Sequence, residues 1–145
     1  NLAVLLSALA HLDLGFMEIF ELFEGKFYIK LEFNKNVKSS ELETLKNLIE
    51  ISLKSGASAQ INRPTILKGE LNFDPNHSQE YAKLGINAKD QRGLMSYVLG
   101  VFKEFDVKIA NARIQTIKNR TRNLLLIQKQ AGVKFSEILK LLESE

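Results

Sequence analysis

Hydrophobic residues recur at helical spacing in two long stretches of the chain. The first stretch lies near the N-terminus and contains Leu2, Leu5, Leu6, Leu9 and Leu12. The second contains Leu94, Val98, Leu99, Val101, Phe102 and Phe105. Recurrence at i, i+3, i+4 and i+7 is typical of a helix with one buried face. Two further helices are predicted, one from Ser40 to about Gly56 and one around Ser136.

Predicted β-strands follow each of the two long helices in pairs. Residues 16–23 and 26–33 come after the first helix and are separated by a Glu-Gly turn. Residues 108–116 and 123–129 come after the second helix and are joined through Lys118-Asn119-Arg120. Short polar or glycine-containing loops between such runs predict β-hairpins. Between the two pairs, a further hairpin is predicted from residues 65–74 and 80–89.

The order helix, strand, strand, helix occurs twice, which indicates an internal repeat. A shift of 93 residues places Asp13 on Asp106 at the exits of the two long helices. The same shift places Leu31 on Leu124 and Phe33 on Leu126, and a shift of 96 then places Leu42 on Ile138. The chain therefore divides into two related units.

Two short motifs in the second half of the chain point to a family. One is Asp90-Gln91-Arg92-Gly93-Leu94 between a strand and a helix, and the other is Ala112-Arg113-Ile114-Gln115-Thr116 on the next strand. Together they resemble the ACT domain, a βαββαβ module that senses amino acids for an attached enzyme. The resemblance implies an α+β fold of tandem ferredoxin-like ACT domains, each an antiparallel sheet with helices on one face. Gln91 and Arg92 stand where the family usually has Arg and Pro.

The strand order predicts how the two units are bounded. Residues 1–57 form a partial first unit that lacks its opening hairpin, residues 58–64 form a linker that contains Pro64, and residues 65–145 form the second unit. In the second unit, residues 65–74 take the place of the family's last strand from the N-terminal side. We expect the missing strands of the first unit to lie upstream in a parent chain or to come from a neighbour, because open strand edges recruit other chains.

This permuted tandem order resembles the C-terminal tail of bacterial enzymes that uridylylate the PII nitrogen-signalling protein. The run Phe73-Asp74-Pro75-Asn76-His77-Ser78 also resembles that tail. The resemblance implies a non-catalytic regulatory segment with glutamine as effector, attached to nucleotidyltransferase and phosphohydrolase domains and reaching PII through them. It implies no cofactor in this segment and magnesium in the parent. The alternatives are an ACT module of another enzyme controlled by amino acids, and a dimerisation module without a ligand.

The resemblance implies a ligand site built from two segments, residues 90–94 and 111–113. The residues concerned are Asp90, Gln91, Arg92, Gly93, Leu94, Asn111, Ala112 and Arg113. A helix N-terminus that follows a glycine turn attracts a carboxylate, and an arginine can bind one with two hydrogen bonds. The alternatives are plain helix capping by Asp90 and an exposed strand arginine at position 113.

Composition removes several other kinds of site. The 145-residue chain has no cysteine, which excludes disulfides and thiolate sites and fits a cytoplasmic setting. Its two histidines, His11 and His77, are too far apart in the sequence to predict a metal site. Asp74, His77 and Ser78 are too close on one turn to form a catalytic triad. We therefore expect no catalytic residues and no metal ligands in this segment.

The charge and the hydropathy of the chain indicate which kinds of partner it binds. Residues 81–145 hold 12 Lys and Arg against 6 Asp and Glu, within a net charge of +3 for the chain. The basic excess is typical of a solvated face or of an anionic partner. Binding of nucleic acid is not expected, because the aromatic residues of this half lie mainly on helices. The apolar run at residues 2–10 is too short to cross a membrane. The aromatic residues of the first unit need a surface to bury them, which predicts that the two units pack together or that the chain forms homo-oligomers.

Overall fold

The computed structural model describes residues 5–6, 9, 14–23, 26–54 and 62–144. Its six strands are β1 (Leu14–Phe23), β2 (Lys26–Phe33), β3 (Leu71–Asp74), β4 (Tyr81–Lys89), β5 (Ile109–Ile117) and β6 (Arg120–Gln128). The helices are α2 (Ser39–Lys54), α3 (Leu94–Glu104) and α4 (Phe135–Leu142), with a short 3₁₀ helix η1 (Lys68–Glu70). Leu5, Leu6 and Leu9 are also helical and buried, as the spacing at the N-terminus predicts.

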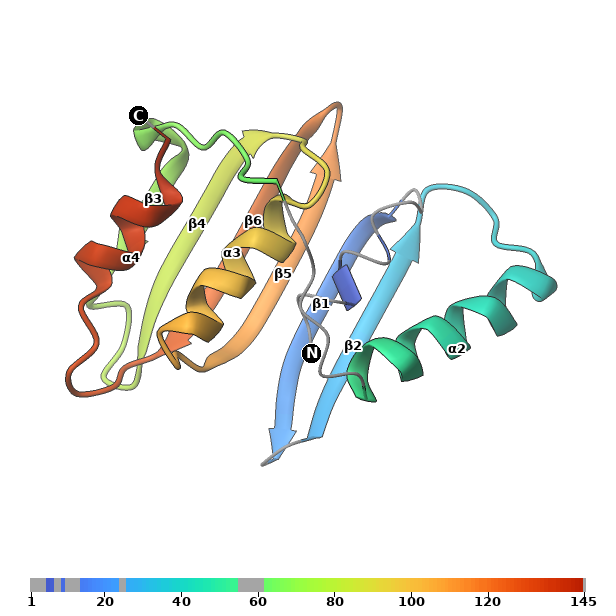
Figure 1. The fold of residues 1–145 in the computed structure, drawn as a ribbon, viewed down its shortest axis with the longest axis horizontal. Coiled ribbons are helices and arrows are strands. Elements are labelled where there is room, and N and C mark those ends of the chain that lie inside the picture. Colours follow the sequence, from blue (N-terminus) through green and yellow to red (C-terminus); the bar gives the residue numbers. More distant parts are fainter. Residues whose placement is uncertain (1–4, 7–8, 10–13, 24–25, 55–61, 145) are drawn as a thin grey trace.

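All six strands join in one antiparallel sheet with the order β2-β1-β5-β6-β4-β3. The helices lie on one face of this sheet (Figure 1). This confirms the predicted α+β class and the ferredoxin-like arrangement of helices on one side. Strand β3 pairs with β4 at the outer edge, so the outer strand of the second unit comes from the N-terminal side as predicted.

The core lies between the sheet and the helices. Every second side chain of the central strands points into it, as the pleat of a strand requires. Its most deeply buried members include Leu84, Ile86, Val98, Phe102, Leu125, Ile127, Ile138 and Leu142. Leu124 does not face the helices, although it lies in the apolar run of β6. Leu124 is 36% exposed on the opposite face, and its neighbours Asn123 and Leu125 point into the core.

The two hairpins differ in length, which changes how the units correspond. Ile19 pairs with Ile29 in the first hairpin, and Ala112 pairs with Leu125 in the second. If Ile19 corresponds to Ala112, the shift is 93 for the first strand and 96 for the second. The predicted match of Leu31 to Leu124 is therefore wrong, because Leu31 packs on the core while Leu124 faces away from it. A slip of this kind moves every side chain of a strand to the other face.

The segment before β3 is not a strand over its whole predicted length. Only residues 71–74 pair in the sheet, and residues 62–67 have no regular secondary structure. The backbone of Ile66 exchanges hydrogen bonds with Ser144, at 3.0 Å to the Ser144 hydroxyl and 2.8 Å from the Ser144 N–H. The Ile66 side chain is fully buried in the core, which explains why the segment resembles a half-buried strand in sequence.

Strands β1 and β5 join the first and second units. They pair antiparallel from Phe16 opposite Gln115 to Phe20 opposite Asn111. The expectation that the two units pack together is met by this pairing. It does not bury all the aromatic residues of the first unit, because Tyr28 stacks on Phe20 at 4.9 Å between ring centres and is still 46% exposed. Self-association stays a prediction, and the side chains of Phe23 and Phe27 lie outside the described part.

Candidate functional site

Three strand ends meet at one edge of the molecule, beside the start of α3. Lys89 at the end of β4 and Ile117 at the end of β5 both pair with Arg120 at the start of β6. The loop after Lys89 leads into α3. Its residues therefore lie over the last residues of β5 and the first residues of β6. This arrangement follows from the antiparallel order, because neighbouring strands run in opposite directions.

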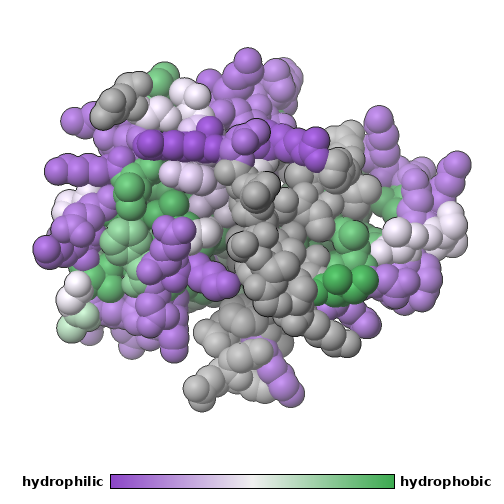
Figure 2. All heavy atoms as spheres, viewed as in Figure 1, coloured by the Kyte–Doolittle hydropathy of each residue, from purple (hydrophilic) through white to green (hydrophobic). Residues whose placement is uncertain are grey.

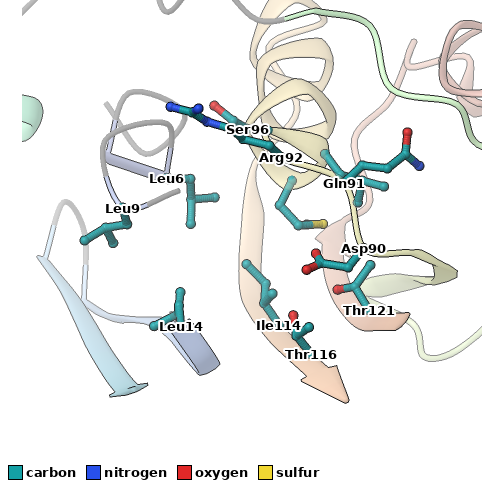
Figure 3. Close-up of a pocket in the computed structure, with 13 residues that line it drawn as sticks. Leu6, Leu9, Leu14, Asp90, Gln91, Arg92, Ser96, Ile114, Thr116 and Thr121 are labelled. Atoms are coloured by element: carbon teal, nitrogen blue, oxygen red, sulfur yellow. The ribbon is translucent and has the colours of Figure 1, made fainter. Parts of the chain in front are cut away.

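A cavity of about 230 Å³ opens at this place. Its lining combines the loop and first turn of α3 with the end of β5, the start of β6 and three leucines of the first unit (Figure 3). The lining residues are Leu6, Leu9, Leu14, Asp90, Gln91, Arg92, Gly93, Leu94, Met95, Ser96, Ile114, Thr116 and Thr121. The volume lies below the roughly 300–1,000 Å³ of pockets for drug-sized ligands. It therefore suits a small metabolite.

The backbone of the loop is set by Gly93. Its φ of 81° lies in the left-handed region, which glycine adopts at no steric cost. The turn lets the Leu94 N–H donate to the Gln91 carbonyl at 3.1 Å, and α3 begins directly afterwards. The N–H groups of a first helical turn have no partner within the helix and carry a partial positive charge. In α3 this turn includes Met95, which lines the cavity.

The Asp90 carboxylate stands at the mouth of the cavity. Its backbone N–H donates to the Asn119 carbonyl at 2.9 Å, which fixes the residue to the β5–β6 turn. The Asp90 side chain is exposed, and within the described residues it has neither an ion pair nor a hydrogen bond. Figure 3 shows it directed toward the same space as Thr116 and Thr121. A negative group and a helix N-terminus therefore border one small cavity.

A buried polar pair lies at the β6 side of the cavity. Thr121 is 3% exposed and lines the cavity, and its hydroxyl donates to the Asn123 Oδ1 at 2.9 Å. Asn123 is also 3% exposed, and its Nδ2 has no hydrogen-bond partner among the described residues. An unsatisfied buried donor costs about 1–3 kcal/mol. Thr121 and Asn123 are two of the three buried polar side chains among the described residues, and the third, Ser96, also lines the cavity.

The side chain of Gln91 serves the fold rather than the cavity. Its Oε1 accepts from the Thr65 N–H at 2.8 Å, and its Nε2 donates to the Thr65 carbonyl at 2.7 Å. The side chain points away from the cavity in Figure 3, where Arg92 extends toward the side on which Leu6 lies. Gln91, which stands where the family usually has Arg, thus connects the segment before η1 to the loop before α3 through hydrogen bonds.

Replacing Gln91 with Ala is expected to lower the free energy of unfolding by about 1–3 kcal/mol, because two neutral hydrogen bonds at about 0.5–1.5 kcal/mol each are lost. Equilibrium denaturation in urea measures the loss. Gln115→Ala, at an exposed position of β5, is the matched control and is expected to change the value by less than about 0.5 kcal/mol. Equal losses in the two variants would contradict the role given to Gln91.

The predicted second segment of the site does not line the cavity. Ala112 is buried under the helices at 1% exposure, on the same face as the cavity but nearer the start of β5. Arg113 points to the opposite face of the sheet, where its guanidinium pairs with the Glu18 carboxylate of β1 at 2.8 Å. Asn111 lies opposite Phe20, toward the other end of the strand. The structure thus brings residues 90–94 together at the cavity and places residues 111–113 elsewhere.

Sequence reasoning missed the strand residues that do line the cavity, Ile114, Thr116 and Thr121. The signal was present, because Ile114 and Thr116 belong to the same Ala-Arg-Ile-x-Thr motif. The antiparallel order brings the C-terminal end of β5, rather than its middle, beside the loop after β4. The contribution of Leu6, Leu9 and Leu14 depends on the pairing of β1 with β5 and has no local signal.

No group of three or more His, Cys, Asp or Glu side chains in the described part is placed to hold a metal ion. None of the helices in that part is long and apolar enough to cross a membrane.

Comparison with known proteins agrees with the fold and the motifs. Residues 70–141 match the model of a family described as ACR9-like, ACT-like domain. The chain is also 31% identical over 71 residues to a bifunctional uridylyltransferase/uridylyl-removing enzyme of Vibrio atlanticus (strain LGP32). That match covers 49% of this chain and 8% of the relative, so the chain spans a small part of the length of that enzyme. No solved structure gives a significant match. Residues 70–141 of the chain therefore match an ACT-like domain in sequence and have the helix and strand arrangement of that fold.

Proposed function

We propose that the cavity beside α3 binds a free amino acid, and that the chain is a regulatory segment of a larger enzyme. The observation that carries this proposal is the position of the Asp90 carboxylate, which has no side-chain partner among the described residues, and of the N-terminus of α3 on the same small cavity. A zwitterion fits both ends of such a site. Its carboxylate is stabilised by the helix N–H groups, and its ammonium group by Asp90.

Glutamine is the first candidate among the amino acids, and PII the first candidate for the target of the larger enzyme. Support comes from the likeness to the uridylyltransferase/uridylyl-removing enzyme, together with the permuted order of strands in the second unit. The polar side chains of Thr116 and Thr121 suit a ligand with a polar side chain. A different amino acid would point to an ACT module of another enzyme.

The position of the cavity suggests how binding reaches other domains. Leu6, Leu9 and Leu14 of the first unit line one side, and the loop before α3 in the second unit lines the other. A ligand in the cavity contacts both units and so favours one packing of the first against the second. Coupling of this kind is typically worth about 1–3 kcal/mol between two sites.

Thermal unfolding of the 145-residue chain with each of the twenty amino acids at millimolar concentration tests the proposal. A ligand that binds the folded state alone raises the melting temperature, since it stabilises that state by about 2.7 kcal/mol at 100 times its Kd. We expect the largest shift with glutamine. The absence of any shift with all twenty amino acids would contradict amino-acid binding by this chain.

A further inference from the structure

Few polar side chains are buried in the described part of the chain, and they gather at the cavity beside α3. Hydrophilic residues cover much of the surface on the side of the helices (Figure 2). Beneath that surface, the buried polar side chains of the described residues are Ser96, Thr121 and Asn123. Ser96 and Thr121 line the cavity, and Asn123 shares a hydrogen bond with Thr121. Polar groups in the described core therefore belong to this one place.

The inward-facing residues of β6 become polar toward the cavity. Alternate residues of this strand are buried, and they are Thr121, Asn123, Leu125 and Ile127. The leucine and the isoleucine lie farther from the cavity and belong to the hydrophobic core. The threonine and the asparagine occupy the part of the strand nearer to it. Apolar residues at positions 121 and 123 would bury more apolar surface, so the polarity of these two positions calls for a reason other than packing.

The Asn123 amide is only half satisfied. Its strand neighbours, Ile86 of β4 and Ile114 of β5, are buried and apolar. Its Oδ1 accepts from the Thr121 hydroxyl at 2.9 Å, whereas its Nδ2 has no partner among the described residues. A leucine has a similar size and would leave no donor unpaired. Because an unpaired buried donor opposes folding, an asparagine at this place indicates a function rather than a contribution to stability.

The hydrogen bond between Thr121 and Asn123 determines what this wall of the cavity offers a ligand. A hydroxyl group has one hydrogen and two lone pairs. Because the Thr121 hydroxyl gives its hydrogen to Asn123, only lone pairs remain for the cavity. The Asp90 carboxylate, which is directed toward the same space in Figure 3, also only accepts hydrogen bonds. The part of the wall that Thr121 and Asp90 form therefore accepts hydrogen bonds and donates none.

We propose that Asn123 is a positioning residue, which holds the Thr121 hydroxyl as an acceptor and so selects amino acids whose side chain ends in an uncharged hydrogen-bond donor. This inference rests on the proposed binding of a free amino acid in the cavity. A side-chain carboxamide donates to Thr121. A carboxylate of the same size has no hydrogen to donate, and Asp90 repels its negative charge. An apolar side chain leaves the Thr121 acceptor unpaired.

Isothermal titration calorimetry of the 145-residue chain with two pairs of amino acids tests the proposal. Glutamine and glutamate differ only at the end of the side chain, and so do asparagine and aspartate. In the pair that binds more tightly, the Kd of the carboxamide is expected to be lower than that of the carboxylate by about tenfold or more. In Asn123→Leu this ratio is expected to fall by about fivefold or more, because the Thr121 hydroxyl is then free to turn and donate to a carboxylate.

The melting temperature separates positioning from a merely structural role. If Asn123 only stabilised β6, Asn123→Leu would lower the melting temperature of the ligand-free chain and leave the ratio of the two Kd values unchanged. We expect the ratio to fall and the melting temperature to stay the same or rise, because the unpaired donor is gone. Asn111→Leu makes the same change toward the other end of β5. It is the matched control and is expected to leave the ratio unchanged.

A second variant removes the acceptor itself. Thr121→Val keeps the shape of the side chain and is expected to weaken binding of the carboxamide by about fivefold or more. It decides the question if Asn123→Leu does not fold. Tighter binding of the carboxylate, binding of other amino acids but of neither pair, or an unchanged ratio in Asn123→Leu would each overturn this inference alone. If the wild-type chain binds no amino acid, the proposed function fails together with it.

Discussion

Replacing Leu125 with Ala is expected to lower the free energy of unfolding by about 2–5 kcal/mol. Leu125 lies on β6, between β5 and β4, and is fully buried against the helices. Its truncation removes buried apolar surface and leaves a cavity that the close-packed surroundings fill only in part. Urea denaturation of the 145-residue chain, followed by far-ultraviolet circular dichroism, measures the loss.

Leu124→Ala removes the same atoms one position earlier and serves as the control. Leu124 lies on the open face of the sheet and is 36% exposed. We expect its truncation to lower the free energy of unfolding by less than about 1 kcal/mol, because a side chain on the open face loses little buried apolar surface when it is shortened. A larger loss for Leu124→Ala than for Leu125→Ala would show that β6 is turned the other way and would contradict the described register.

The register of β6 also shows what the sequence could and could not predict. The hydrophobic run of this strand has leucines at positions 124, 125 and 126, so alternation does not say which of them faces the helices. The strand also begins at Arg120 rather than Asn123, since its polar residues pair with the end of β4. Helix and strand types follow from local periodicity. The facing of a uniformly apolar strand depends on its partners, which are distant in the sequence.

The candidate site, like the fold, was predictable only where it depends on residues close together in the sequence. Residues 90–94 follow from a local motif, because a glycine turn and a helix start are properties of a few neighbouring residues. The rest of the lining comes from the end of β5, the start of β6 and the first unit. These parts meet only through the pairing of β5 with β6 and of β1 with β5. Arg113 illustrates the limit, since its chemistry suits a carboxylate but its strand position directs it to Glu18 on the other face.

Asp90→Asn is expected to weaken amino-acid binding by about 10- to 100-fold, if the proposed function holds. A hydrogen bond to a charged group contributes about 1.5–3 kcal/mol, and each 1.4 kcal/mol is about a factor of ten in Kd. Asparagine keeps the size of the side chain while it removes the charge that would pair with the ligand's ammonium group. Isothermal titration calorimetry measures the change, with the amino acid that gives the largest thermal shift as ligand.

Asp106→Asn removes an equal charge at the far end of α3 and is the matched control. Asp106 is exposed, and its φ of 53° is one that asparagine also tolerates. An eleven-residue helix spans roughly 16 Å at about 1.5 Å per residue, which exceeds the Debye length of about 8–10 Å. We therefore expect Asp106→Asn to change the Kd by less than about twofold. Equal weakening in the two variants would assign the effect to net charge, and undiminished binding by Asp90→Asn would remove Asp90 from the ligand site.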